Sequence, residues 1–214
     1  MTHDMSLSLS SCVVLLGLGA FHGINPGMGW LFAVALGMQE QRRTAVWRAL
    51  LPLGVGHALA VAAAVAIAIM AGVVVSLDKL RWPVAIVLIS LGVLRLIRHR
   101  HFRWVGMRVG MGGLMLWSFL MASAHGAGLM VVPVFLTMTM AGSVPPGDMM
   151  MTPEPAAAIF ATLLHAAGYL LVTAAVALLV FEKLGLGLLR KAWLNLDVVW
   201  AAALIATGVL TAML

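Results

Sequence analysis

Four histidines stand inside long apolar segments of this chain, at positions where leucine, valine or alanine would be ordinary: His22, His57, His125 and His165. Polar side chains in an apolar segment are costly, so they usually face the interior of a helix bundle or a water-filled cavity. Imidazole is the commonest metal ligand in proteins and carries protons near neutral pH. The four histidines are therefore the candidate site, with structural packing as the alternative.

The four segments that carry these histidines contain no Asp or Glu. A site for a hard cation normally needs carboxylates, whereas nitrogen donors alone suit copper, zinc, nickel or cobalt. The same histidines would equally suit paired axial ligation of a haem iron. The donor set therefore leaves two chemistries open, a transition-metal site and a haem or redox centre.

The stretch FHGINPGMGW, residues 21–30, interrupts the first apolar segment with residues that break helices. Pro26 lacks an amide proton, and its ring clashes with the carbonyl group four positions earlier, which belongs to His22. We therefore expect the His22 carbonyl to be available as a further ligand. The other break positions and auxiliary donors in this stretch are Gly23, Asn25, Gly27 and Met28.

A second proline, Pro133, predicts a helix break in the fourth apolar segment that frees the carbonyl of Leu129. A tolerated kink is the alternative, because proline kinks are common in membrane helices. Met138 and Met140 follow at the head of a methionine-rich stretch and are candidate auxiliary ligands, since thioethers favour Cu(I). Methionine is also a general filler of apolar cores.

The composition places the chain in a lipid bilayer. Of its 214 residues, 63% are hydrophobic and 9% are charged, and the mean hydropathy is +1.09. Soluble domains carry about 25% charged residues, so this sequence cannot cover a water-facing surface. We expect an all-α integral membrane protein in which residues 1–214 form one membrane domain. The single cysteine, Cys12, excludes an internal disulfide and a cysteine-based metal cage.

Six apolar segments are the predicted transmembrane helices. They lie at about 11–38, 50–76, 83–98, 107–141, 156–181 and 194–213. Lys and Arg gather in the loops after the first, third and fifth segments, so the positive-inside rule puts these loops in the cytoplasm. Both termini would then lie on the outer side of the inner membrane. The net charge of +6 is thus explained by topology, and we expect no nucleic-acid partner.

Two pairs of segments resemble each other. AFHGINPGM in the first segment and SAHGAGLMVVP in the fourth each place a His-Gly pair before a proline, and the histidines of the second and fifth segments each precede a run of Ala and Val. The chain would then contain two three-helix repeats, about 11–98 and about 107–213. Because three is odd, the second repeat is inverted relative to the first. Inverted repeats are common in secondary transporters, whose sites lie at the repeat interface.

At GAFHGINPGMGW and LGVGHALAVA the chain resembles the lysine-exporter superfamily, most nearly the branch of nickel/cobalt exporters and hydrogenase or urease accessory permeases. That branch has a motif like His-Ala-x-Asp-Pro-Asp-His, followed by Leu-Gly-His-Ser. His22, Pro26 and His57 match these motifs, whereas Asn25 and Met28 stand where the first motif has Asp and His. The resemblance implies six helices in two inverted repeats. The departures imply a neutral, softer site, with room for copper or a non-metal substrate.

The leading functional hypothesis is therefore a small secondary-type transporter for a transition-metal ion, with the four histidines at the repeat interface. The alternatives are a membrane metalloenzyme or haem protein that uses the same histidines, and a non-catalytic subunit of a larger complex. Besides the bilayer and a small ion or molecule as substrate, the expected partners are a second copy of the chain or another subunit.

Overall fold

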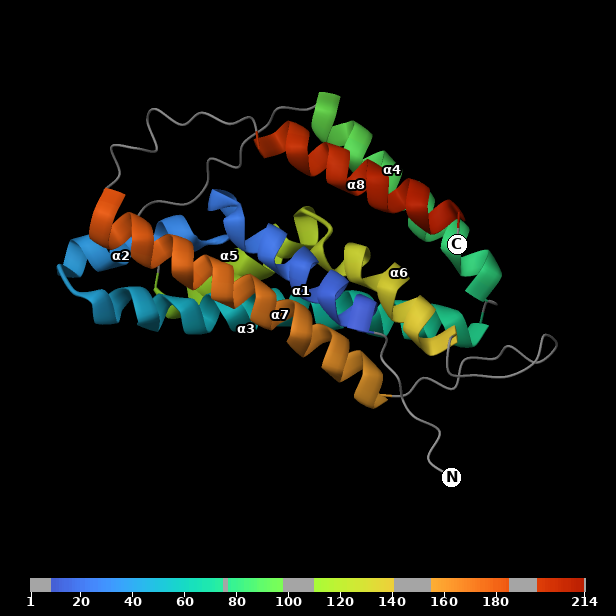
Figure 1. Cartoon of the computed structure of the whole chain (residues 1–214), viewed down its shortest axis with the longest axis horizontal. Coiled ribbons are helices and arrows are strands. Elements are labelled where there is room, and N and C mark those ends of the chain that lie inside the picture. The colour runs from blue at the N-terminus through green and yellow to red at the C-terminus, as the bar shows by residue number, and fades with distance from the viewer. Residues whose placement is uncertain (1–8, 75–76, 98–109, 141–154, 185–195, 214) are drawn as a thin grey trace.

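A computed structural model describes residues 9–74, 77–97, 110–140, 155–184 and 196–213 of the chain. The secondary structure in these ranges is helical, which confirms the all-α prediction (Figure 1). The elements are α1 (Leu9–Ile24), the 3-10 turn η1 (Pro26–Met28), α2 (Trp30–Glu40), α3 (Arg43–Val74), α4 (Leu77–Ile97), α5 (Met111–Ala124), α6 (Ala127–Met140), α7 (Pro155–Leu179), the π-helical turn η2 (Val180–Leu184) and α8 (Leu196–Met213).

Two of the six predicted segments are each broken into two helices. The first segment becomes α1 and α2, joined by η1, and the fourth becomes α5 and α6, which are bent by 62°. A glycine with positive φ stands at each break, Gly29 at 130° and Gly126 at 72°. Glycine suits both positions because it has no Cβ to clash in this region of backbone space.

The proline rule located only one of these two breaks. Pro26 begins η1, as expected of a proline next to a helix end. Pro133 instead lies inside α6, which continues past it to Met140. The predicted break at Pro133 is therefore corrected to Gly126, seven residues earlier, where positive φ interrupts the helix.

The helices pack mainly in pairs, α1 along α7, α3 along α5 and α4 along α8, and α3 also packs against α7. Figure 1 shows the α4–α8 pair on one side of the other helices. An apolar cluster joins this pair to the rest, with Leu88 of α4 and Trp200 and Leu204 of α8 next to Met130 and Tyr169. The pair is thus attached to the other helices through a small set of large side chains.

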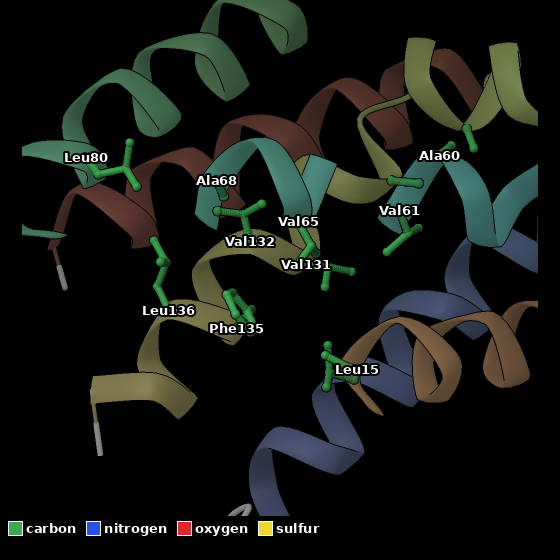
Figure 2. Packing of buried hydrophobic residues seen from close by; sticks show 13 residues of the cluster. Leu15, Ala60, Val61, Val65, Ala68, Leu80, Val131, Val132, Phe135 and Leu136 are labelled. Carbon is green, nitrogen blue, oxygen red and sulfur yellow. The ribbon is translucent and has the colours of Figure 1, made fainter. Parts of the chain in front are cut away.

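The pairing of α3 with α6 buries branched and aromatic side chains. Val61 and Val65 of α3 lie next to Val131 and Phe135 of α6, and Leu15 of α1 completes the contact (Figure 2). All five side chains are buried. The cluster contains residues of α1, α3 and α6. It therefore ties α1 and α3, which carry His22 and His57, to one framework.

Glycines let α1 and α7 approach at backbone distance. A Cβ at Gly19 would overlap the carbonyl oxygen of His165 and lie 2.9 Å from the amide nitrogen of Tyr169. Reciprocally, a Cβ at Gly168 would overlap the carbonyl oxygen of Leu16. Small residues at a helix interface permit this close approach. The spacing brings the histidines of α1 and α7 to the same level.

Two described helices are long and apolar enough to cross a membrane, Arg43–Ala71 and Pro155–Lys183, and the bent α5–α6 pair makes a third if it counts as one span. Leu9–Ile24 and Val198–Met213 are shorter apolar helices. Large apolar side chains are also exposed on the outer faces of α3 and α7, for example Ile67 at 69% and Leu171 at 68%. Such an apolar surface is unusual for a soluble monomer and typical of contact with lipid or another protein.

Substitution of Gly19 by alanine should lower the stability of the fold, since the added methyl group overlaps α7. We expect a loss of about 1–3 kcal/mol, the usual cost of overpacking, measured as thermal unfolding of the detergent-purified chain by circular dichroism. Gly17→Ala on the same helix is the matched control, because a Cβ at Gly17 meets no atom within 4 Å. Equal effects of the two substitutions would contradict the close α1–α7 contact.

Candidate functional site

Three of the four predicted histidines meet at one point. His22 comes from α1, His57 from α3 and His165 from α7, and each side chain is fully buried, with 0% exposure. The ring centroids of His22 and His165 lie 5.2 Å apart, those of His57 and His165 5.3 Å, and those of His22 and His57 5.7 Å. We call these three side chains the histidine cluster.

Most ring nitrogens of the histidine cluster have no hydrogen-bond partner. The Nδ1 atom of His22 lies 2.7 Å from the carbonyl oxygen of Leu18, one turn earlier on α1. The Nε2 atom of His22 and both ring nitrogens of His57 and His165 are buried without a hydrogen bond, although the ring of His165 approaches the backbone of Leu15. Buried polar atoms are rarely left unpaired, so five such atoms in one cluster point to a ligand.

His125 lies next to the histidine cluster. Its ring contacts Trp200 of α8 at a centroid distance of 5.5 Å, and Trp200 also contacts His22 at 4.6 Å. The Nδ1 atom of His125 lies 2.8 Å from the carbonyl oxygen of Met121, one turn earlier on its helix, as His22 does with Leu18. The structure therefore groups three of the four histidines by ring contact and brings the fourth to Trp200, which His22 also contacts.

Tyr169 connects the histidine cluster to the break in the first segment. Its ring stacks on His57 at a centroid distance of 3.9 Å, with 5° between the ring planes. Its hydroxyl group donates a hydrogen bond of 2.7 Å to the carbonyl oxygen of Met28. Tyr169 lies one turn beyond His165 on α7 and is fully buried. A movement of the His57 ring would therefore disturb the residue that holds η1 in place.

The carbonyl of His22, expected to be an available ligand, is already paired. It accepts a hydrogen bond of 3.2 Å from the amide nitrogen of Asn25. The Oδ1 atom of Asn25 in turn accepts from the amide nitrogen of Gly27 at 2.9 Å, which is a local turn that asparagine commonly forms. The chain turns back on itself at Pro26 and gives each of these oxygens one local partner. Such an oxygen has two lone pairs, so the ligand roles of the His22 carbonyl and of Asn25 stay predictions.

Tryptophan side chains satisfy two further carbonyl groups of this break. The Nε1 atom of Trp30 donates to the carbonyl oxygen of Ile24 at 2.9 Å, and Nε1 of Trp117 donates to that of Gly27 at 3.0 Å. Together with the Tyr169 hydroxyl, these donors replace the helical hydrogen bonds that the break removes. Helix breaks within apolar surroundings require such replacement donors.

The remaining predicted site residues have structural positions of several kinds. Met28 is buried beside Trp200 and Tyr169, and Gly23 lies inside α1, where a Cβ would lie 2.6 Å from the carbonyl oxygen of Tyr169. Met138 packs against the apolar cluster of α3 and α6. The side chain of Met140, and the methionines and basic residues of 98–109, 141–154 and 185–195, lie outside the described residues.

Sequence reasoning missed the three aromatic residues that organise this region, Trp117, Tyr169 and Trp200. One signal was available, because Tyr169 is the single tyrosine of the chain and stands four residues after His165, on the same helical face. The positions of Trp117 and Trp200 carry no comparable signal, since their partners are up to 178 residues away along the chain.

The described acidic side chains lie far from the histidine cluster. Glu40, at the end of α2, pairs with Arg48, and Glu182, in η2, pairs with Arg43 at 3.0 Å. Glu182 follows His165 by 17 residues on a continuous helix, which is roughly 25 Å at the usual rise. Among the side chains that the structure describes, the immediate surroundings of the cluster are therefore uncharged.

The ring spacing of the histidine cluster fits a metal ion. With metal–nitrogen bonds of about 2.0–2.1 Å, three imidazoles around one ion would have ring centroids roughly 5–5.5 Å apart, close to the observed 5.2–5.7 Å. No three His, Cys, Asp or Glu side chains of the described ranges are nevertheless arranged to hold a metal. Binding would therefore require ring rotation, which no hydrogen bond opposes at His57, whereas the ring of His165 approaches the backbone of Leu15.

Comparison with known proteins adds no relative, since no protein-family model, curated protein or solved structure matches this chain. The chemistry of the site must therefore be judged from its own residues.

Replacement of His57 by phenylalanine should raise the thermal stability of the metal-free protein. Phenylalanine retains an aromatic ring next to Tyr169 and removes two buried nitrogens that have no partner. Relief of such a penalty is worth about 1–3 kcal/mol, measured as a higher unfolding temperature in detergent. His22→Phe is the comparison, because it also removes the bond to Leu18 and should gain less. A fall in stability for His57→Phe, or a gain no larger than that of His22→Phe, would contradict the absence of partners at the His57 nitrogens.

Proposed function

We propose that this chain is a six-span transporter of a transition-metal cation in the cytoplasmic membrane, and that His22, His57 and His165 form its substrate site. The observation that carries the proposal is the set of five unpaired ring nitrogens in three fully buried histidines from three helices. A chain that needed only packing at this point would use apolar side chains, since unpaired buried nitrogens reduce stability. Function explains their presence better than folding does.

Several features support the membrane part of the proposal. The six apolar segments are helical in the described ranges, and α3 and α7 expose large apolar side chains outward. The ion pair between Arg43 and Glu182 puts the start of α3 and the end of α7 at the same end of the molecule. That agrees with a common cytoplasmic side for the loops after the first and fifth segments. The proposed topology has both termini on the outside.

The arrangement of helix pairs supports the two inverted repeats. If α1–α2 corresponds to α5–α6, α3 to α7 and α4 to α8, then the pairing of α1 with α7 corresponds to that of α3 with α5, and the α4–α8 pair corresponds to itself. The contacts in that last pair are reciprocal. A Cβ at Gly92 would lie 2.9 Å from the carbonyl oxygen of Ala201, and a Cβ at Gly208 would lie 3.0 Å from that of Ala85.

The two helix breaks provide the hinges for alternating access. Each break follows one of the buried histidines. Gly29 comes seven residues after His22, and Gly126 comes directly after His125. In transporters built from inverted repeats, broken helices line the substrate site and one unit rocks against the other. Here we propose that one repeat rocks against the other about these breaks, while the α4–α8 pair contacts the site through Trp200.

The geometry favours a small ion over haem. Two axial histidines must leave room between them for the whole macrocycle, whereas the three rings of the cluster lie within 5.7 Å of one another. Tyr169 stacks directly on His57, and Trp200 contacts His22. A single ion requires only rotation of the rings, whereas a macrocycle requires separation of α1, α3 and α7.

Transport by the full chain in liposomes tests this function. We expect uptake of at least one of Cu(I), Zn(II), Ni(II) or Co(II), followed with an enclosed metal-sensitive dye. His57→Ala and His165→Ala should each lower that uptake by about 10–100-fold or more, since loss of a ligand is at least as damaging as loss of a residue that orients one.

Thr211→Val on α8 is the control for this assay. Thr211 is buried and donates a hydrogen bond within its own helix, to the carbonyl oxygen of Thr207 at 2.7 Å. This variant should transport like the unmodified chain. Uptake of all four metals at the level of empty liposomes, or undiminished uptake by both histidine variants, would overturn the proposed function.

A further inference from the structure

The charge of the histidine cluster's surroundings distinguishes between possible substrates. Three neutral imidazoles carry no charge, and the nearest described carboxylates, those of Glu40 and Glu182, are paired with arginines at the far end of the helices. The energetic cost of burying an ion in a medium of low polarity rises with the square of its charge, so a divalent ion costs about four times as much as a monovalent one. A buried neutral site therefore discriminates by charge.

Soft thioether groups lie in the apolar cluster whose aromatic rings contact the histidine cluster. The buried side chains of Met28 and Met130 lie in one apolar cluster with Tyr169 and Trp200, and Met121 packs against that cluster. Thioethers select Cu(I) among the common metal ions, and imidazole is compatible with copper. Oxygen donors, which hard cations require, are confined here to hydroxyl and carbonyl groups that are mostly paired within the protein.

The number of histidine donors also favours a monovalent ion. Three imidazoles at near-equal spacing suit a three-coordinate ion such as Cu(I) without any further ligand. Zn(II) takes four ligands in a tetrahedral site, so the three histidines would leave it one donor short. The Tyr169 ring stacks on His57 and its hydroxyl group already bonds to Met28, so it does not supply that donor.

From these three observations we infer that the histidine cluster takes a soft monovalent cation, Cu(I), in preference to Zn(II), Ni(II) or Co(II). This inference rests on the proposed function and makes it more specific. It requires the rings of His57 and His165 to rotate toward one point, with His22 held by its bond to Leu18. The charge and donor set of the site, rather than its size, then select the metal.

Competition binding to the purified full chain in detergent tests the inference, with Ag(I) as a monovalent probe that does not change oxidation state under these conditions. The background variant is Cys12→Ala, which removes the single thiol. We expect one Ag(I) per chain that resists displacement by about 100-fold excess of Zn(II) or Ni(II), which corresponds to a preference of at least that factor. His57→Phe and His165→Phe should each lose this equivalent, whereas Thr211→Val should keep it.

The outcomes separate the inference from the proposed function. If Zn(II) or Ni(II) binds at one equivalent, is lost in both histidine variants and displaces Ag(I) at equal concentration, the charge argument is wrong while the transporter proposal stands. If the histidine variants bind every metal as the background chain does, both proposals are overturned. Retention of the Ag(I) equivalent in one histidine variant alone would reduce the site to two ligands and would overturn the three-ligand inference.

Discussion

The close contact of α1 with α7 constrains everything around the histidine cluster. Gly19 and Gly168 bring the two backbones together, so that the residues one turn later on α1 and one turn earlier on α7 face each other. His22 and His165 occupy these facing positions, and His57 reaches them from α3. Side chains packed this tightly exclude water. The ring nitrogens are therefore removed from solvent by the same contact that brings them together.

The break in the first segment is connected to this contact through Tyr169 of α7. A continuous helix would satisfy its own carbonyl groups, whereas the turn at Pro26 leaves several without helical partners. Trp30, Trp117 and Tyr169 donate to three of them. Because Tyr169 also stacks on His57, the conformation of the break and the orientation of a site histidine depend on one side chain. The break is therefore stabilised by hydrogen bonds from aromatic side chains and is coupled to the site through Tyr169.

The unpaired nitrogens of the histidine cluster lower the stability of the fold around them. Two clusters of buried apolar side chains pack the framework around the site, one centred on α3 and α6 and one that joins α4 and α8 to Met28, Met130 and Tyr169. The histidine cluster reduces the stability of that framework, since unpaired nitrogens in its centre carry a desolvation penalty. Functional sites are the usual places where local packing rules are broken in this way.

Much of this could be read from the sequence, because it depends on residue type and spacing. The apolar segments, the all-helical class, the break near Pro26 and the four buried histidines follow from hydropathy, from the missing amide of proline and from the rarity of imidazole in apolar runs. Other features depend on partners that are distant in sequence. The ring contact of Trp200 with His22, and the hydrogen bonds of Trp117 and Tyr169 to the first break, were decided only when helices distant in sequence came together. Hydropathy and helix propensity act along the chain, so they can be read from the sequence. The packing of helices decides where a histidine ring points and whether its nitrogens find a partner, and the sequence alone does not show which helices lie side by side.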